Sequence, residues 1–141
     1  MRTEYKFEAA LPYSLHDMRV SSIRIIDADL HFTFENGIVK LSGPCNQLNG
    51  TMTLEKIDQD FCTVFLLSKN GKCGKFQGQK MELARFLSKY DSFSFEIVDE
   101  LYGYHQVCYG GFLSLPECSY LIEIQITVYY NGSIVYNTEE M

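Results

Sequence analysis

Residues 121–136 read LIEIQITVYYNGSIVY, and this stretch indicates the fold class. Apolar side chains at every second position up to Val128 alternate with polar ones, which is the period of a strand with one buried face. Asn131-Gly132 supplies the two positive-φ residues that a type I′ turn requires. We therefore predict a hairpin in which residues 121–130 form the first strand and Val128 faces Val135.

Asn-Gly pairs occur at three further places, and each is predicted to form a hairpin tip. They lie at positions 36/37, 49/50 and 70/71. Around the first of them, Phe34 is expected to face Val39. Phe32 then faces Leu41 on the same apolar side. The predicted core consists of Phe32, Phe34, Val39, Leu41, Val64, Leu66, Ile124, Ile126 and Val128.

The middle of the chain adds a central strand and one helix. Residues 61–67 are apolar on both faces, which is typical of a strand covered on both sides. Residues 80–90 carry the only helical spacing of apolar positions, so a short helix is expected to cover that strand. Gly110-Gly111 is predicted to be a turn or bulge. We predict a mostly β domain over residues 1–141, an antiparallel, hairpin-rich barrel or sandwich of about ten strands with one short helix.

Composition narrows the classes of function. Hydrophobic residues make up 46% and charged residues 21% of the chain, as in ordinary globular proteins. The net charge of −6 repels phosphate backbones, so nucleic acid is not expected as a partner. No apolar stretch is long enough to span a bilayer and the N-terminus does not resemble a secretory signal, so we expect a cytoplasmic protein without a membrane partner. Five cysteines without a C-x-x-C pair are expected to stay reduced.

Candidate catalytic residues are few. His105, Cys108 and His16 provide a thiol and two bases, but Cys108 lies at no recognisable helix start that would lower its pKa. His105 and Cys108 are three residues apart, so on a strand they point to opposite faces. The sequence therefore favours a protein that is not an enzyme, and no cofactor is expected.

Two clusters of charged residues have both a functional and a purely structural interpretation. On a strand, Asp27, Asp29 and His31 would share one face and could hold a metal ion, although a solvated outer face is the simpler interpretation. The second cluster is a loop containing Lys69, Lys72 and Lys75. It is interpreted as a lysine-bearing hairpin tip or as a docking site for an anion or an acidic partner.

The tyrosines suggest a binding surface. In the predicted C-terminal hairpin, Tyr129 and Tyr136 point away from the core together with Thr127 and Gln125, and Tyr104 lies in a second tyrosine-rich run. Tyrosine is enriched at protein interfaces because its large ring carries a polar tip. The sequence thus favours a non-catalytic interaction or accessory module that binds a protein partner or a second copy. The alternative is a small ligand-binding or hydrolytic β domain with a His/Cys/Asp polar pocket.

Overall fold

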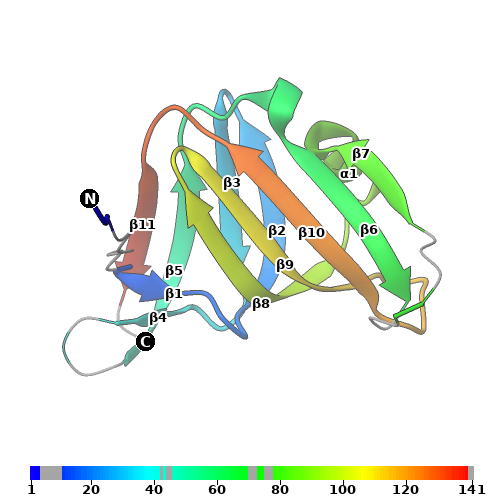
Figure 1. Cartoon of the computed structure of the whole chain (residues 1–141). Coiled ribbons are helices and arrows are strands. Elements are labelled where there is room, and N and C mark those ends of the chain that lie inside the picture. The colour runs from blue at the N-terminus through cyan, green and yellow to red at the C-terminus, as the bar shows by residue number, and fades with distance from the viewer. Residues whose placement is uncertain (4–10, 42, 44–45, 70–72, 75–77, 140–141) are drawn as a thin grey trace.

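The computed structural model describes residues 1–3, 11–41, 43, 46–69, 73–74 and 78–139. These residues form eleven strands, one α-helix and one 3-10 turn (Figure 1). The strands are β1 (Tyr13–Ser14), β2 (Arg19–Ile26), β3 (Asp29–Phe34), β4 (Ile38–Lys40), β5 (Asn46–Leu54), β6 (Thr63–Lys69), β7 (Gln79–Glu82), β8 (Ser94–Gly103), β9 (Gln106–Ser114), β10 (Ile122–Tyr129) and β11 (Ile134–Glu139). The helix α1 spans Leu83–Lys89 and the 3-10 turn η1 spans Gln59–Phe61. The mostly β prediction with one short helix is confirmed.

All strands belong to one antiparallel sheet. Its order is β1-β4-β5-β3-β2-β8-β9-β10-β6-β7, and β11 pairs with β5. The sheet curls so that β2 and β3 lie behind β9 and β10 (Figure 1). Among the described residues, β7 and β11 do not pair with each other, so the curled sheet is not closed into a complete barrel.

The core fills the space between the two halves of the curled sheet. The rings of Phe32 on β3 and Tyr109 on β9 meet with centroids 5.7 Å apart, and both side chains are fully buried. Seven of the nine predicted core residues are buried as expected: Phe32, Phe34, Val64, Leu66, Ile124, Ile126 and Val128. The prediction is wrong for Val39, which is half-buried, and for Leu41, which is 44% exposed. Val39 lies in the middle of β4, where Ile38 takes the buried position, and Leu41 follows the end of that strand.

The observed two-residue hairpins use turns that contain no Asn-Gly pair. Asp27 and Ala28 connect β2 to β3, and Tyr104 and His105 connect β8 to β9. Asp27 and His105 have φ values of 56° and 50°. Aspartate and histidine enter this left-handed region more readily than most non-glycine residues. The search for Asn-Gly pairs therefore did not predict these two hairpins.

The prediction of hairpin tips at Asn36-Gly37 and Asn49-Gly50 is wrong. Asn36 and Gly37 connect β3 to β4, which pair with β5 rather than with each other. Gly37 does adopt a positive φ of 81°. Asn49 and Gly50 lie inside β5. Asn70-Gly71 lies outside the described residues.

The predicted C-terminal hairpin is also wrong. Asn131 and Gly132 do turn the chain, but β11 crosses to pair with β5, whereas β10 pairs with β6 and β9. Val128 consequently faces Val107 on β9 and not Val135. The backbone N–H groups of Asn131 and Gly132 donate instead to the carbonyl oxygens of Lys56 and Glu55, at 2.8 and 3.0 Å.

The helix and the adjoining strands differ in detail from the prediction. Residues 79–82, predicted in part as helix, form β7 on the edge of β6, and α1 begins only at Leu83. Phe86 of α1 is buried against the open side of the sheet and contacts Phe93. One face of β6 is buried while the other is half-buried, so the predicted covering of both faces is incomplete. Gly110-Gly111 lies within β9, so the predicted turn is wrong, but the register of β8 shifts opposite this pair, between Ile97 and Asp99, as the alternative of a bulge predicts.

Candidate functional site

Several loops meet at the upper end of the molecule in Figure 1. We call this surface the turn end, and it comprises residues 26–29, 55–61, 104–105 and 129–133. Backbone hydrogen bonds join these segments to one another. Ile57 donates to Ala28 at 2.8 Å and Asp58 donates to Tyr129 at 2.8 Å. Tyr130 donates to the carbonyl oxygen of His105 at 3.1 Å, so loops distant in sequence form one connected surface.

Aromatic side chains project from the turn end. Phe61 is 61% exposed, Tyr129 38% and Tyr104 92%. The Phe61 and Tyr129 rings meet edge to face with centroids 6.2 Å apart. A second group forms around His105, whose ring centroid lies 4.3 Å from that of Tyr104 and 5.8 Å from that of Tyr130. Exposed aromatic side chains that contact one another are a feature of binding surfaces.

Local structure explains these positions. Alternation along β10 turns Tyr129 outward, because Val128 beside it is buried. The turn η1 precedes β6, and its last residue Phe61 lies outside the strand. The N–H of Phe61 donates to the carbonyl oxygen of Asp58, which itself is bonded to Tyr129. Asp58 therefore fixes η1, and with it Phe61, beside the end of β10.

The turn end is acidic. It contains five carboxylates and one lysine, Lys56. Two of the carboxylates stabilise loops: Asp29 accepts the N–H of Lys56 at 3.0 Å and Glu55 accepts that of Ser133 at 3.3 Å. The carboxylates are Asp27, Asp29, Glu55, Asp58 and Asp60. The exposed rings therefore lie in a region of negative charge.

The predicted tyrosine face exists only in part. Gln125, Thr127 and Tyr129 share the outer face of β10, as expected from alternation. Tyr136 does not join them, because β11 pairs with β5. Its ring packs against the core with its centroid 4.8 Å from that of Tyr13. The prediction that Tyr136 points outward beside Tyr129 is therefore wrong.

Tyr102 and Tyr109 form an internal cluster. The Tyr102 hydroxyl donates to Glu100 at 2.7 Å, and the buried Tyr109 hydroxyl lies 3.5 Å from that of Tyr102. Burial raises the pKa of both hydroxyls. Burial, with the nearby charge of Glu100, also raises the pKa of Tyr136 to about 12. These tyrosines stay protonated at neutral pH and contribute to packing rather than to an exposed surface.

The three catalytic candidates do not come together. The Nδ1 atom of His105 lies 3.1 Å from the carbonyl oxygen of Tyr130. Cys108 lies on the outer side of β9, where Thr127 donates to its sulfur at 3.7 Å. His16 contacts the carbonyl oxygen of Val98 at 2.6 Å and the side chain of Asp17. In the part of the chain that the structure describes, no hydrogen bond or ion pair connects these candidates to one another.

Two of the three metal candidates, Asp29 and His31, form local contacts, and Asp27 lies off the strand that carries them. Asp27 lies in the β2–β3 turn, Asp29 accepts the N–H of Lys56, and the Nδ1 atom of His31 lies 3.0 Å from the hydroxyl of Thr53. The described residues contain no group of three or more His, Cys, Asp or Glu side chains that could hold a metal ion.

The lysine loop is described only at its start. Lys69 ends β6, and its ammonium group lies 4.6 Å from the centre of the Tyr120 ring. Lys72 and Lys75 lie outside the described residues. Lys69 is at the opposite end of β6 from Phe61, so Lys69 and the turn end lie on separate surfaces.

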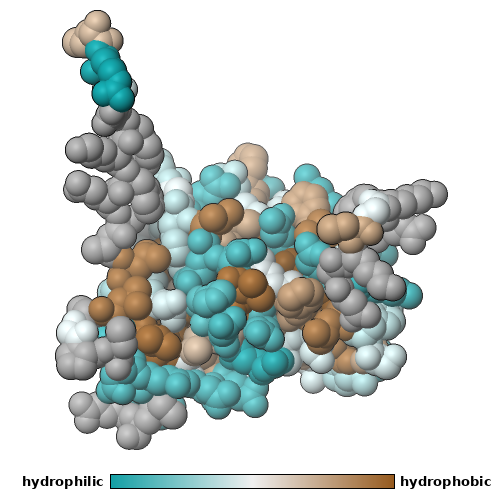
Figure 2. Space-filling view, turned by 60° about the horizontal axis from the view of Figure 1, so that its bottom comes forward, coloured by the Kyte–Doolittle hydropathy of each residue, from teal (hydrophilic) through white to brown (hydrophobic). Residues whose placement is uncertain are grey.

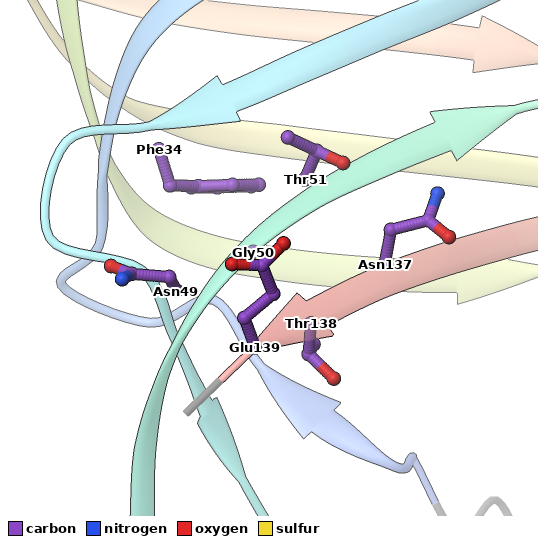
Figure 3. Close-up of a pocket in the computed structure, with 7 residues that line it drawn as sticks. All are labelled: Phe34, Asn49, Gly50, Thr51, Asn137, Thr138 and Glu139. Carbon is purple, nitrogen blue, oxygen red and sulfur yellow. The ribbon is translucent and has the colours of Figure 1, made fainter. Parts of the chain in front are cut away.

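A polar pocket lies on β5 and β11 (Figure 3). Its volume is about 540 Å³, and Asn49 faces Glu139 while Thr51 faces Asn137 across the two strands. Phe34 completes one wall. Within the described part of the chain, the side chains of these four polar residues form no hydrogen bond or ion pair. They are therefore available to a polar ligand.

The opposite side of the molecule differs from the turn end. In Figure 2 the lower end of Figure 1 faces forward, and hydrophilic residues separate the hydrophobic groups visible there. No helix formed by the described residues combines the length and apolar character needed to cross a membrane.

Comparisons of the chain with protein-family models, with curated proteins and with solved structures gave no match. Function is therefore inferred from the geometry of the turn end and of the polar pocket.

Proposed function

We propose that the protein is a non-catalytic interaction module that docks a protein partner through the turn end. The observation that carries this proposal is the mutual contact of exposed rings, above all Phe61 with Tyr129. Aromatic side chains supply much of the binding energy at protein interfaces, because they bury a large area and lose little conformational entropy. The net charge of −6 favours a protein over nucleic acid as the partner. A cytoplasmic location is part of the same proposal.

The rigidity of the turn end supports a docking role. Backbone hydrogen bonds of 2.8 to 3.1 Å join the β5–β6 connection to the β2–β3 turn and to Tyr129 of β10, and join Tyr130 to the β8–β9 turn. A surface whose loops are already ordered loses less entropy on binding than a flexible one. Phe61 and Tyr129 are thus held in position before a partner arrives.

The experiment compares variants that remove rings at the turn end with one that removes an apolar side chain elsewhere. The purified protein, the double variant Phe61→Ala/Tyr129→Ala and the control Leu41→Ala are immobilised and exposed to extract of the source organism. Leu41 is exposed but lies beside β4, away from the turn end. Captured proteins are identified by quantitative mass spectrometry, and sedimentation velocity tests binding to a second copy.

We expect a partner that the control retains and the double variant loses. Its purified complex should weaken by about tenfold or more when both rings are removed, since central interface aromatics commonly contribute above about 1 kcal/mol each. Self-association with the same dependence on the rings also supports the proposal. If no captured protein depends on Phe61 and Tyr129 and the chain stays monomeric, the proposal fails.

A second candidate function is binding of a small neutral polar ligand in the pocket on β5 and β11. It is favoured by the unpartnered side chains of Asn49, Thr51, Asn137 and Glu139 around a volume of about 540 Å³, within the range of ligand sites. A panel of neutral mono- and disaccharides is titrated while amide NMR signals are recorded. Shifts at residues 49–51 and 137–139 that disappear in Asn137→Ala support this function, and no shift with any sugar contradicts it.

A further inference from the structure

The exposed rings of the turn end have carboxylates directly beside them in the chain. Asp58 lies directly before the first residue of η1, and Asp60 lies within η1, immediately before Phe61. Asp58 is also the residue whose backbone contacts both Phe61 and Tyr129. Apart from His105, Lys56 is the one basic residue among the described residues of this surface. The surface therefore combines an aromatic pair with an excess of negative charge.

We propose that the turn end binds a basic segment of the protein partner, with an arginine or lysine side chain seated on the rings of Phe61 and Tyr129. The inference rests on the proposed docking function and specifies the chemistry of the partner. A cation within about 6 Å of an aromatic ring centre is attracted by the negative face of the ring. Nearby carboxylates at Asp58 and Asp60 then form charge-assisted hydrogen bonds with the same group.

The edge-to-face geometry suits a flat guanidinium. Because the Phe61 and Tyr129 rings meet at an interplanar angle of 64°, the edge of one ring meets the face of the other. With Phe61 61% exposed, its ring remains accessible to an incoming side chain. Arginine stacks on such rings more readily than lysine because its charge is planar and weakly hydrated. Arginine should therefore bind more tightly than lysine.

The negative charge of the turn end also disfavours binding of a second copy, an acidic protein or a nucleic acid. A second copy docking through the same end would bring five carboxylates and one lysine against an identical set, and like charges repel. An acidic partner or a phosphate backbone would be repelled in the same way. A basic segment is the partner whose charge is complementary to this surface.

The test uses three eight-residue peptides, acetylated and amidated, in which glycine alternates with arginine, lysine or glutamate. Each is titrated into isotopically labelled full-length protein, and affinity is measured by calorimetry. The arginine peptide should shift the amide signals of residues 58–61 and 129, and the glutamate peptide should shift none. Affinity should fall as salt is raised from 50 to 500 mM, because screening acts within roughly 10 Å at 0.1 M salt.

Matched variants separate a specific site from general attraction between opposite charges. Phe61→Ala should weaken arginine-peptide binding by roughly two- to fivefold, the loss of one exposed cation–π contact. Asp58→Asn/Asp60→Asn should weaken it further. The control Asp91→Asn/Glu117→Gln removes the same charge from exposed positions outside the turn end and should leave binding within about twofold. Equal loss in both double variants would overturn the inference.

The outcomes distinguish this inference from the proposed function. Suppose that a captured partner requires Phe61 and Tyr129 but binds equally well at high salt and to the Asp58→Asn/Asp60→Asn variant. The docking function then stands, and the proposal of a basic segment is refuted. Failure of the arginine peptide to shift residues 58–61 likewise refutes the basic segment and leaves the docking function standing. If, in addition, no captured protein depends on the rings and the chain stays monomeric, both proposals fall together.

Discussion

A methyl group added at Gly111 should destabilise the protein far more than one added at its neighbour Gly110. Gly111 faces Ile97 across the β8–β9 pairing, at the point where the register shifts between Ile97 and Asp99. A Cβ atom at Gly111 would overlap the carbonyl oxygen of Glu96 and lie 3.0 Å from the amide nitrogen of Val98. Both are backbone atoms, so they cannot turn aside as a side chain would.

The neighbouring glycine provides a matched control. A Cβ atom at Gly110 would come no closer than 3.7 Å to the Cβ atom of Asp99, which is ordinary van der Waals contact. Gly110→Ala should therefore change the free energy of unfolding by within about 1 kcal/mol, and any gain would come from the lower entropy that alanine gives the unfolded chain. Gly111→Ala forces β8 and β9 apart, and overpacking together with weakened strand hydrogen bonds should cost about 3 kcal/mol or more.

Urea unfolding followed by far-UV circular dichroism measures both variants, with amide NMR spectra recording the extent of any change. If Gly111→Ala does not fold while Gly110→Ala does, the reasoning is supported in its strongest form. Equal stability of the two variants, to within about 1 kcal/mol, would refute the register of β8 against β9 and the irregularity at Ile97.

Three further predictions concern other parts of the fold. Tyr136→Ala should cost about 2 kcal/mol in urea unfolding, because the ring packs against the core, whereas Tyr129→Ala should cost less than about 1 kcal/mol; similar losses would contradict their different burial. Burial raises the pKa of Tyr136 to about 12, whereas an unfolded tyrosine ionises near pH 10. Stability should therefore be complete below pH 10 and fall as pH rises toward 12, and Tyr136→Phe should make this fall shallower. Gly37→Ala should destabilise by about 2 kcal/mol or more, because the positive φ is strained and the new Cβ atom would overlap the carbonyl oxygen of Leu48; unchanged stability would contradict the observed path from β3 to β4.

Along β10 the sequence predicted the buried face correctly, whereas along β11 it did not, since Tyr136 packs against the core. Alternation placed Ile124, Ile126 and Val128 inside and Tyr129 outside, because successive side chains of a strand point to opposite faces whichever strand lies beside it. The helix was found for a similar reason, since the spacing of Leu83 and Phe86 is a local property.

Strand partners were predicted less well because pairing depends on contacts far apart in the chain. Asn131-Gly132 has the composition of a hairpin turn, yet its N–H groups bond to Lys56 and Glu55. The observed tight turns place Asp27 and His105 at positive φ, a conformation that non-glycine residues adopt less often than the glycine of an Asn-Gly pair. Asn-Gly pairs therefore marked places where the chain bends but did not specify which strands would meet.

In the candidate site, too, features set by neighbouring residues could be predicted, whereas features set by contacts distant in sequence could not. Tyr129 and Tyr104 were predicted as binding residues, and both are exposed at the turn end. Sequence reasoning misses Phe61, because the apolar run that begins with it is typical of one strand covered on both faces. The preceding Asp58-Gln59-Asp60 is the available signal, since a turn at that point places the next side chain outside the strand.

The proposed docking surface arises from the connection that contradicted the predicted hairpin. If residues 130–133 had folded back along β10, the end of that strand would have been covered by its own partner. Instead the chain crosses to β5, and Asp58 is left to bond with the carbonyl oxygen of Tyr129. That bond brings η1, and therefore Phe61, into contact with the Tyr129 ring. The aromatic pair and its adjacent carboxylates are thus a product of topology, and no single segment of the chain carries them.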